Sequence, residues 1–220
     1  MKYGRKNKYK HISIICNGED YTEKKIKQYC SNSDYIIAVD GGLKILEKLS
    51  IKPNLILGDM DSLNENILIK YNDIKKEKYS TDKDFTDSEL AIQKAINFNP
   101  EKISILAATG SYIDHSFANM INLLRNYNAK IDIKIVTENS IIFPIINKKI
   151  LRDYSGKRFS IFPIGEVKGI ILKGCKYTFK DKSDLLPIDY SISNVIIRNK
   201  ACISVKKGML ICILFDENFL

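Results

Sequence analysis

The chain has 220 residues, 45% of them apolar, which is enough to bury the core of one large domain or two small ones. Its net charge is +9, but the lysines are spread among acidic residues along the whole sequence, so we expect a solvated lysine-rich surface and no nucleic-acid partner. No apolar run approaches the roughly 18 residues of a membrane helix, and no secretory signal follows the basic start. We therefore expect a cytoplasmic protein with no membrane partner, and five buried, reduced cysteines.

Short isoleucine-rich runs alternate with amphipathic segments in the first two-thirds of the chain. Each run is bounded by glycine, aspartate or asparagine, which is typical of buried parallel strands. The expected strands are His11–Cys16, Tyr35–Val39, Leu55–Leu57, Ile103–Ala107 and Ile131–Val136. Strands that alternate with helices in this way predict an α/β layer with a mainly parallel sheet.

Two helices can be placed from their first turns. The segment from Thr86 to Glu89 has the form of a capping box, and helically spaced apolar residues follow from Leu90 to Phe98. Ser116 is expected to cap a second helix. The apolar face of that helix is expected to contain Phe117, Met120, Ile121 and Leu124.

The pattern changes after about residue 147, and strand candidates separated by turn signals replace the helices. The candidates are Arg158–Pro163, Val167–Leu172, Lys176–Phe179, Asn194–Arg198, Ala201–Lys206 and Met209–Phe215, with the first turn at Gly165-Glu166. They predict a small antiparallel β domain, a sandwich or partial barrel. The fold class is thus α/β, with an α/β domain over residues 1–147, a β domain over residues 148–220, and a boundary within Asn147–Gly156.

Aspartates follow the expected strands at the points where the strands end. The set comprises Asp40, Asp59, Asp61, Asp84, Asp87 and Asp114. In an open α/β sheet, ligands bind outside the carboxyl ends of the strands, so we expect these side chains to face one crevice. For any one aspartate taken alone, a role as a helix cap or turn former is the alternative.

Clustered carboxylates stay ionised together only when cations neutralise them. Mg²⁺ is the natural candidate because it prefers hard oxygen ligands and is usually held by one or two carboxylates together with substrate phosphates. An ATP tail would complete that shell, and Lys83 could add a positive charge beside it. Glycines 41, 42, 58 and 110 allow close backbone approach to phosphate oxygens. His115 is either a general base or a residue that fixes the loop holding Asp114.

Taken in order, these motifs resemble those of the thiamine pyrophosphokinase family over nearly the whole chain. The similar segments are Asp40-Gly41-Gly42, Gly58–Ser62, Lys83–Asp87 with Glu89, Ala107–His115, Gly174–Tyr177 and Ser193-Asn194. The resemblance implies that ATP and thiamine react to give thiamine diphosphate and AMP. It also implies a homodimer, in which thiamine lies between the nucleotide domain of one subunit and the β domain of the other.

The resemblance also implies roles for individual residues. The implied Mg²⁺ ligands are Asp59, Asp61, Asp84 and Asp87, and the implied catalytic residues are Asp59, Asp61, Asp84 and Asp114. The implied ATP-binding residues are Asp40, Gly41, Gly42, Lys83, Thr109, Gly110 and His115. The implied thiamine contacts are Asp87, Ser193 and Asn194.

Two departures from the family pattern affect the substrate contacts. The family's arginine after Gly-Gly is Tyr112 here, so either another cation, Lys83 or Arg125, replaces it, or phosphate binding is weaker. The chain also has no tryptophan to stack on the thiamine ring. Two alternative functions are a related diphosphokinase for a pterin alcohol and a basic nucleotide- or RNA-binding module. The second gives no reason for six aspartates at one sheet edge.

Overall fold

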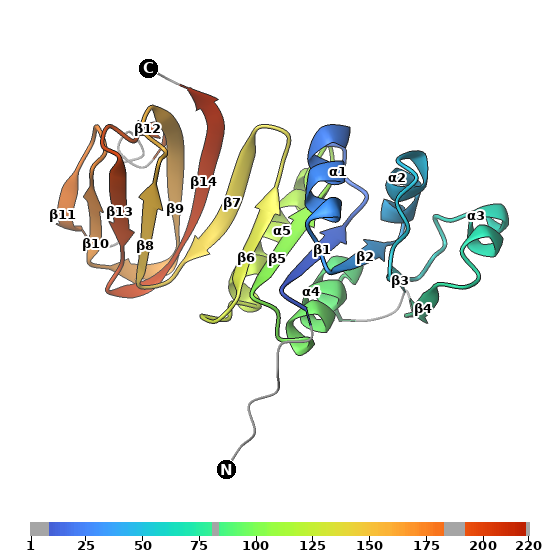
Figure 1. Ribbon diagram of the computed structural model, residues 1–220. Helices are drawn as coiled ribbons and strands as arrows, with labels where there is room; N and C mark the ends of the chain where they lie inside the picture. The colour runs from blue at the N-terminus through green and yellow to red at the C-terminus, as the bar shows by residue number, and fades with distance from the viewer. Residues whose placement is uncertain (1–8, 81–83, 183–191, 219–220) are drawn as a thin grey trace, which may run out of the picture. The chain divides into compact units, whose positions relative to one another are not determined.

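The computed structural model describes residues 9–80, 84–182 and 192–218, and the chain divides into two compact units between Glu138 and Asn139 (Figure 1). This division lies earlier than the boundary predicted within Asn147–Gly156. The reason is strand β7 (Ser140–Ile145), which pairs antiparallel with β14 (Lys207–Asn218) and so groups with the C-terminal unit. The α/β fold class, with a parallel-rich sheet and a separate antiparallel sheet, is confirmed.

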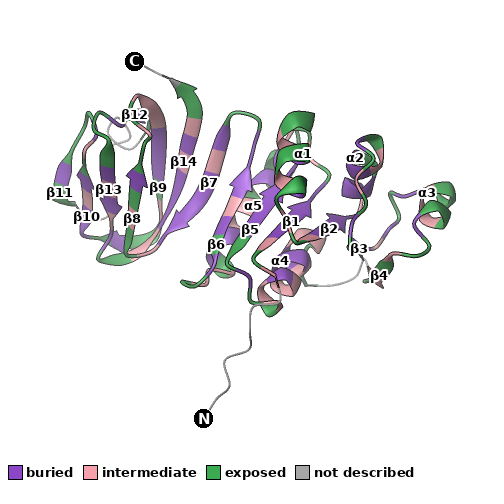
Figure 2. Cartoon of the chain, in the orientation of Figure 1, coloured by how far each residue is buried: buried purple, intermediate pink, exposed green. Residues whose placement is uncertain are grey.

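The described part of the N-terminal unit has six parallel strands in the order β6-β5-β1-β2-β3-β4. Their bounds are β1 (His11–Ile15), β2 (Tyr35–Val39), β3 (Leu55–Gly58), β4 (Lys75–Lys78), β5 (Lys102–Leu106) and β6 (Asp132–Val136). Five match the predicted strands, and their interiors are buried because helices cover the sheet (Figure 2). The charged strand β4 was not predicted; its lysines suit an edge strand, where charge discourages further pairing.

The helices of this unit are α1 (Glu23–Ser31), α2 (Gly42–Lys48), α3 (Glu65–Lys70), α4 (Asp87–Asn97) and α5 (Ile113–Arg125). Helix α4 begins as predicted, since the Thr86 hydroxyl accepts a hydrogen bond from the Glu89 amide at 3.2 Å. The longest of these helices, α5, falls short of the length needed to cross a membrane, and no other described helix reaches it.

The predicted start of α5 is wrong, because the helix begins after Tyr112 and not after Ser116. The Ser116 hydroxyl lies inside the first turn, where it donates to the Tyr112 carbonyl at 2.9 Å and accepts from the Gly110 amide at 3.1 Å. The predicted apolar face is also wrong at Phe117, whose side chain is largely exposed. The buried residues of the helix include Asn122.

The C-terminal unit consists of antiparallel strands in two groups, β12-β9-β14-β7 and β11-β10-β13-β8. The further bounds are β8 (Lys148–Arg152), β9 (Lys157–Lys168), β10 (Ile170–Lys173), β11 (Phe179–Lys182), β12 (Asn194–Val195) and β13 (Lys200–Ser204). The turn predicted at Gly165-Glu166 is wrong: β9 continues through a register shift there and ends before Gly169, which has φ +70°. Both groups contribute side chains to one core, which includes Phe159, Leu172 and Ile203.

Candidate active site

The carboxyl ends of β5, β1, β2 and β3 lie side by side, because these strands are parallel neighbours in the sheet. Hydrogen bonds join the loops that leave them. The Gly18 amide, after β1, donates to the Ala107 carbonyl, after β5, at 2.6 Å. The Met60 amide, after β3, donates to Asp40 Oδ1, after β2, at 3.3 Å. The strand-end argument thus brings the predicted loops to one edge of the sheet.

The loops after β2 and β3 fit together at Asp40 and Gly58. Asp40 has φ +44°, Gly58 has φ +139° and Met60 has φ +65°, all in regions that L-residues rarely occupy. A Cβ atom on Gly58 would lie 1.7 Å from Asp40 Oδ1, so the carboxylate occupies the space that any side chain at position 58 would need. Strained backbone of this kind clusters at functional sites.

Asp59 and Asp61 lie in the turn after β3. Asp59 Oδ1 accepts a hydrogen bond from the Asp61 amide at 2.9 Å, and the Asp61 residue is exposed. The short Asp-x-Asp turn therefore fixes one carboxylate against the backbone and leaves the other facing solvent. Both carboxylates offer hard oxygen atoms, the ligand type that Mg²⁺ prefers.

Gly41 and Gly42 owe their identity to close packing. A Cβ atom on Gly42 would lie 2.1 Å from the Ile15 carbonyl oxygen, and one on Gly41 would lie 2.3 Å from the side-chain carbon of Asn17. Their lack of side chains lets α2 begin against the carboxyl end of β1. Their predicted role in ATP binding stays a prediction.

The loop after β1 contributes polar residues that the sequence analysis missed. The Asp20 carboxylate accepts hydrogen bonds from the Thr109 hydroxyl at 3.0 Å and from the Glu138 amide at 2.9 Å. Glu19 accepts from the Ser111 amide at 3.4 Å. The same strand-end signal that indicated Asp40 was present, because these residues lie in the loop that follows β1, four and five residues after its last residue, Ile15.

Asp84 and Asp87 lie beside the start of α4. Asp84 is exposed, Asp87 is the first residue of the helix, and the predicted ATP contact Lys83 lies outside the described residues. Within residues 9–80, 84–182 and 192–218, no three acidic, histidine or cysteine side chains come close enough together to hold a metal ion. The structure thus joins Asp40 to the Asp59–Asp61 turn, and among the described residues these carboxylates and those of Asp84 and Asp87 form no ready-made metal site.

Asp114, His115 and Tyr112 are exposed at the first turn of α5. Asp114 Oδ1 accepts from the His115 amide at 2.8 Å, and the rings of Tyr112 and His115 have centroids 5.9 Å apart. A carboxylate in this position is stabilised by the positive end of the helix dipole. Either function suggested for His115, general base or support for Asp114, is compatible with this arrangement.

Arg125 is not positioned to replace the family arginine at Tyr112. It is the last residue of α5, about 20 Å along the helix from the first turn at 1.5 Å per residue. Its guanidinium is ion-paired at 3.2 Å with Glu89 of α4. Of the two cations suggested from the sequence, Lys83 therefore remains.

In the C-terminal unit, Ser193 and Asn194 have different environments. Asn194 is fully buried: Oδ1 accepts from the Tyr177 amide at 3.1 Å and the Val195 amide at 2.8 Å, and Nδ2 donates to the Tyr177 carbonyl at 2.8 Å. These bonds hold the Gly174–Tyr177 segment. Ser193 is half-buried, has φ +56°, and accepts from Arg158 at 3.4 Å.

A cavity of about 490 Å³ lies away from these loops, near His11 and Lys102 at the amino ends of β1 and β5. The His11 ring contacts the Asn32 carbonyl at 3.0 Å and the Ser104 hydroxyl at 2.9 Å. Burial lowers the pKa of His11, which favours a neutral ring. None of the predicted site residues lines this cavity, so the predicted reaction is not assigned to it.

Two family models match this chain one after the other. The family described as "Thiamin pyrophosphokinase, catalytic domain" matches residues 26–135, and "Thiamin pyrophosphokinase, vitamin B1 binding domain" matches residues 147–210. The thiamine pyrophosphokinase of Bacillus subtilis is 29% identical over 212 residues, which cover 93% of this chain and 98% of that protein.

Solved structures give the same result. The crystal structure of the Bacillus subtilis protein aligns over 94% of this chain and 100% of its own, with a TM-score of 0.80 and 25% identity. The yeast thiamin pyrophosphokinase, at 18% identity, covers 96% of this chain and 87% of its own, with a TM-score of 0.76, and supports the fold. Because the family's catalytic and vitamin-binding domains both match in order along the sequence, this chain belongs to the thiamin pyrophosphokinase family.

Proposed function

We propose that the chain transfers the diphosphate of ATP to the hydroxyl of thiamine at the carboxyl ends of β1, β2, β3 and β5. The thiamine oxygen bonds to the β-phosphorus, the bond from that phosphorus to the oxygen shared with the α-phosphate breaks, and AMP leaves. The hydroxyl proton passes to a base. The family assignment supports this reaction, and the match to a vitamin B1 binding domain favours thiamine over a pterin alcohol.

The observation that carries the location is the interlocked pair of loops after β2 and β3. Gly58 leaves room for the Asp40 carboxylate. That carboxylate accepts a hydrogen bond from the backbone amide of Met60, the residue between Asp59 and Asp61. This contact holds the Asp-x-Asp turn beside the Asp40 loop before any ligand binds. Preorganised groups of this kind cost no reorganisation during reaction.

The donor set fits Mg²⁺, because its members are all carboxylates with hard oxygen atoms. Asp59, Asp61, Asp84 and Asp87 would hold the ion, with ATP phosphates supplying further oxygens. When bound, Mg²⁺ neutralises phosphate charge and stabilises the leaving AMP.

We assign the remaining residues of the N-terminal unit by position. Asp114 accepts or orients the thiamine hydroxyl proton, with His115 beside it in the same helical turn. Asp40, Gly41, Gly42, Thr109 and Gly110 are assigned to ATP binding by position, and Lys83, which lies outside the described residues, is assigned the same role from its sequence motif. The Thr109 side chain is held in place by the hydrogen bond that its hydroxyl donates to Asp20.

We further propose a homodimer with thiamine at the subunit interface, in contact with Asp87 and Ser193, while the fully buried Asn194 supports that contact by holding the Gly174–Tyr177 segment. Exposed apolar side chains on the first turns of α5 support a contact surface, since Tyr112, Ile113 and Phe117 are 73%, 77% and 59% exposed. The five free cysteines fit a reducing cytoplasm. Light scattering of the purified chain tests the dimer.

AMP release tests the proposed reaction. Purified protein is incubated with ATP, Mg²⁺ and thiamine, and AMP and thiamine diphosphate are separated by chromatography. We expect equal amounts of the two products, none without thiamine and none with excess EDTA. Equal AMP release with a hydroxymethyl pterin in place of thiamine would contradict the assigned acceptor, and unchanged turnover in EDTA would contradict the metal.

A further inference from the structure

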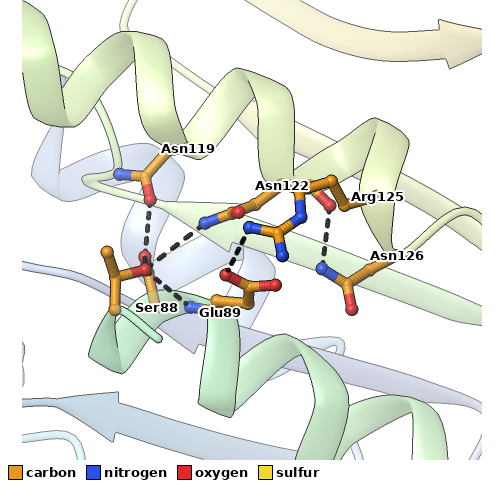
Figure 3. Close-up of polar contacts among 7 residues, drawn as sticks. Ser88, Glu89, Asn119, Asn122, Arg125 and Asn126 are labelled. Atoms are coloured by element: carbon orange, nitrogen blue, oxygen red, sulfur yellow. Dashed lines mark hydrogen bonds and ion pairs between the residues drawn. The ribbon is translucent and has the colours of Figure 1, made fainter. Parts of the chain in front are cut away.

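Polar side chains connect the first turn of α4 to one face of α5 (Figure 3). On the α4 side are Thr86, Ser88 and Glu89. On the α5 side are Asn119, Asn122 and Arg125, which follow each other at intervals of three residues and so share a helix face. Helix α4 begins in the Asp84–Asp87 segment, and α5 follows the Ala107–Gly110 turn. The cluster therefore joins the helices next to two segments of the proposed site.

Asn119 contacts both segments with one side chain. Its Nδ2 donates to the Ala108 carbonyl at 2.7 Å, and its Oδ1 accepts from the Ser88 hydroxyl at 2.6 Å. A carbonyl can only accept, which fixes the orientation of the amide. The single hydroxyl hydrogen of Ser88 is thereby used on Asn119, so in the 3.0 Å contact between Ser88 and Thr86 the Thr86 hydroxyl donates.

The hydrogen bonds therefore run in one direction, from Thr86 through Ser88 and Asn119 to the Ala108 carbonyl. Thr86 Oγ1 has two lone pairs left, which accept the Glu89 amide at 3.2 Å and Asn122 Nδ2 at 3.4 Å. Each of these hydrogen bonds pairs one donor with one acceptor. Connected networks of this type rigidify the groups that they join.

An ion pair also contributes to this junction between α4 and α5. Glu89 lies in the first turn of α4, its side chain is 5% exposed, and it pairs with Arg125 at 3.2 Å. A carboxylate this buried needs its partner, so the pair resists sliding of one helix along the other. The junction thus combines a directional hydrogen-bond chain with an ion pair whose carboxylate is buried and whose guanidinium is 56% exposed.

We infer that Asn119 is a positioning residue for diphosphate transfer, which sets the Asp84–Asp87 segment against the Ala107–Gly110 turn. The inference rests on the proposed function, since it assumes that both segments contact the reacting groups. Asn119 acts through Ser88 and Ala108 and need not touch a substrate. A displacement of about 1 Å between catalytic segments can lower the rate about a hundredfold, so loss of the bridge should be visible in kcat.

Asn119→Ala is compared with Asn126→Ala, a control at the C-cap of the same helix, because among the residues that the structure describes the Asn126 side-chain amide donates only to the Asn122 carbonyl, at 3.1 Å. We expect kcat to fall about tenfold or more in Asn119→Ala and to stay within about twofold in Asn126→Ala. Hydrogen exchange should become faster in peptides covering residues 84–89 and 107–110 together, and only in Asn119→Ala.

Ser88 provides a second variant should Asn119→Ala not fold. Ser88→Ala removes the hydroxyl that links Thr86 to Asn119, whereas Ser88→Thr keeps it. We expect Ser88→Ala to lower kcat and Ser88→Thr to restore it. The double variant Ser88→Ala with Asn119→Ala should lose no more activity than Asn119→Ala alone, because both changes break one chain of bonds.

The outcomes separate the two ideas. Wild-type kcat in both Asn119→Ala and Ser88→Ala, or fully additive losses in the double variant, would overturn the positioning role and leave the proposed function standing. An unaltered protein that forms no AMP from ATP and thiamine would overturn the proposed function and the positioning role with it. Faster exchange in only one of the two peptides would also refute the bridge.

Discussion

The loops at the carboxyl ends of β2 and β3 and the Ser193-Asn194 pair of the C-terminal unit both carry motifs of the family, but their side chains are placed differently. In the loops, Asp61 is exposed, and the shape of the backbone depends on Gly58. In the C-terminal unit, Asn194 is fully buried, and its amide is bonded to the main chain of Tyr177 and Val195. One motif presents its side chains to solvent, whereas the other uses an amide to hold a neighbouring segment.

Residues of a family motif can therefore either contact ligands or stabilise the fold. Burial and hydrogen bonding distinguish these two roles. A substitution of an exposed carboxylate should change activity and leave the free energy of unfolding nearly unchanged. A substitution of a buried, fully bonded amide should lower the free energy of unfolding. Turnover and the free energy of unfolding, measured for each variant, therefore distinguish the two roles.

Asp61→Asn should have the largest effect on activity. It keeps the size of the side chain and removes the charge, so about 3 kcal/mol of phosphate stabilisation, or about a hundredfold in kcat, should be lost. Asp153→Asn is the control, because Asp153 is an exposed aspartate in a turn with φ +63°. Turnover is measured as AMP release, and stability by thermal melting. Near-normal turnover in Asp61→Asn would remove the metal role.

Gly58→Ala tests whether the Asp40 carboxylate needs the space beside the glycine. The added methyl would meet Asp40 Oδ1 at 1.7 Å on a backbone with φ +139°. We expect a loss of about 2–3 kcal/mol of stability from strain and displacement, and about tenfold lower turnover.

Gly165→Ala is the matched control for that change, because Gly165 also has positive φ (+71°) but nothing within 4 Å of the added atom. It should cost about 1 kcal/mol and leave turnover unchanged. Equal effects of the two substitutions would show that backbone conformation alone, without the Asp40 contact, explains Gly58.

Asn194→Ala tests whether the buried Asn194 amide stabilises the fold. It removes an amide bonded to Tyr177 and Val195 and leaves buried main-chain groups unpaired, so denaturant unfolding should report a loss of about 2 kcal/mol. Ser193→Ala should change stability by less than about 0.5 kcal/mol and instead raise the KM for thiamine. A raised KM in Asn194→Ala with unchanged stability would place Asn194 with the substrate contacts.

Much of the fold could be predicted from the sequence, because buried parallel strands leave a strong local signal. Isoleucine-rich runs are found at β1, β2 and β5, where helices cover the sheet. Strand β4 could not be recognised from its Lys-Lys-Glu-Lys sequence, since its pairing with β3 is a tertiary contact. The continuation of β9 through Gly165 was missed for the same reason, because a bulge and a turn share the same glycine signal.

For the predicted site too, local sequence indicated the residues but not their tertiary contacts. The rule that ligands bind at strand ends located Asp40, Asp59 and Asp61 correctly at one sheet edge, and the same rule applied to β1 would have added Asp20. The partner of Arg125 could not be inferred, because its pairing with Glu89 depends on how α4 packs against α5. Residue type indicates which charges are available, but packing decides which of them remain available to a ligand.

Tyr112→Arg should have the smallest effect, and it tests whether the exposed edge can accept the cation that family members carry. Tyr112 is 73% exposed at the start of α5, so the longer side chain can be accommodated without repacking. An exposed charge pair contributes up to about 1 kcal/mol, so the KM for ATP should fall by up to about fivefold and the melting temperature should stay the same. Ser111→Arg is the matched control, because that neighbouring residue is exposed, lies outside the proposed contact surface and gains the same charge. An equal decrease in both variants would indicate a general effect of net charge, whereas an unchanged KM in Tyr112→Arg would mean that another group, with Lys83 the remaining candidate, already fills the arginine's role.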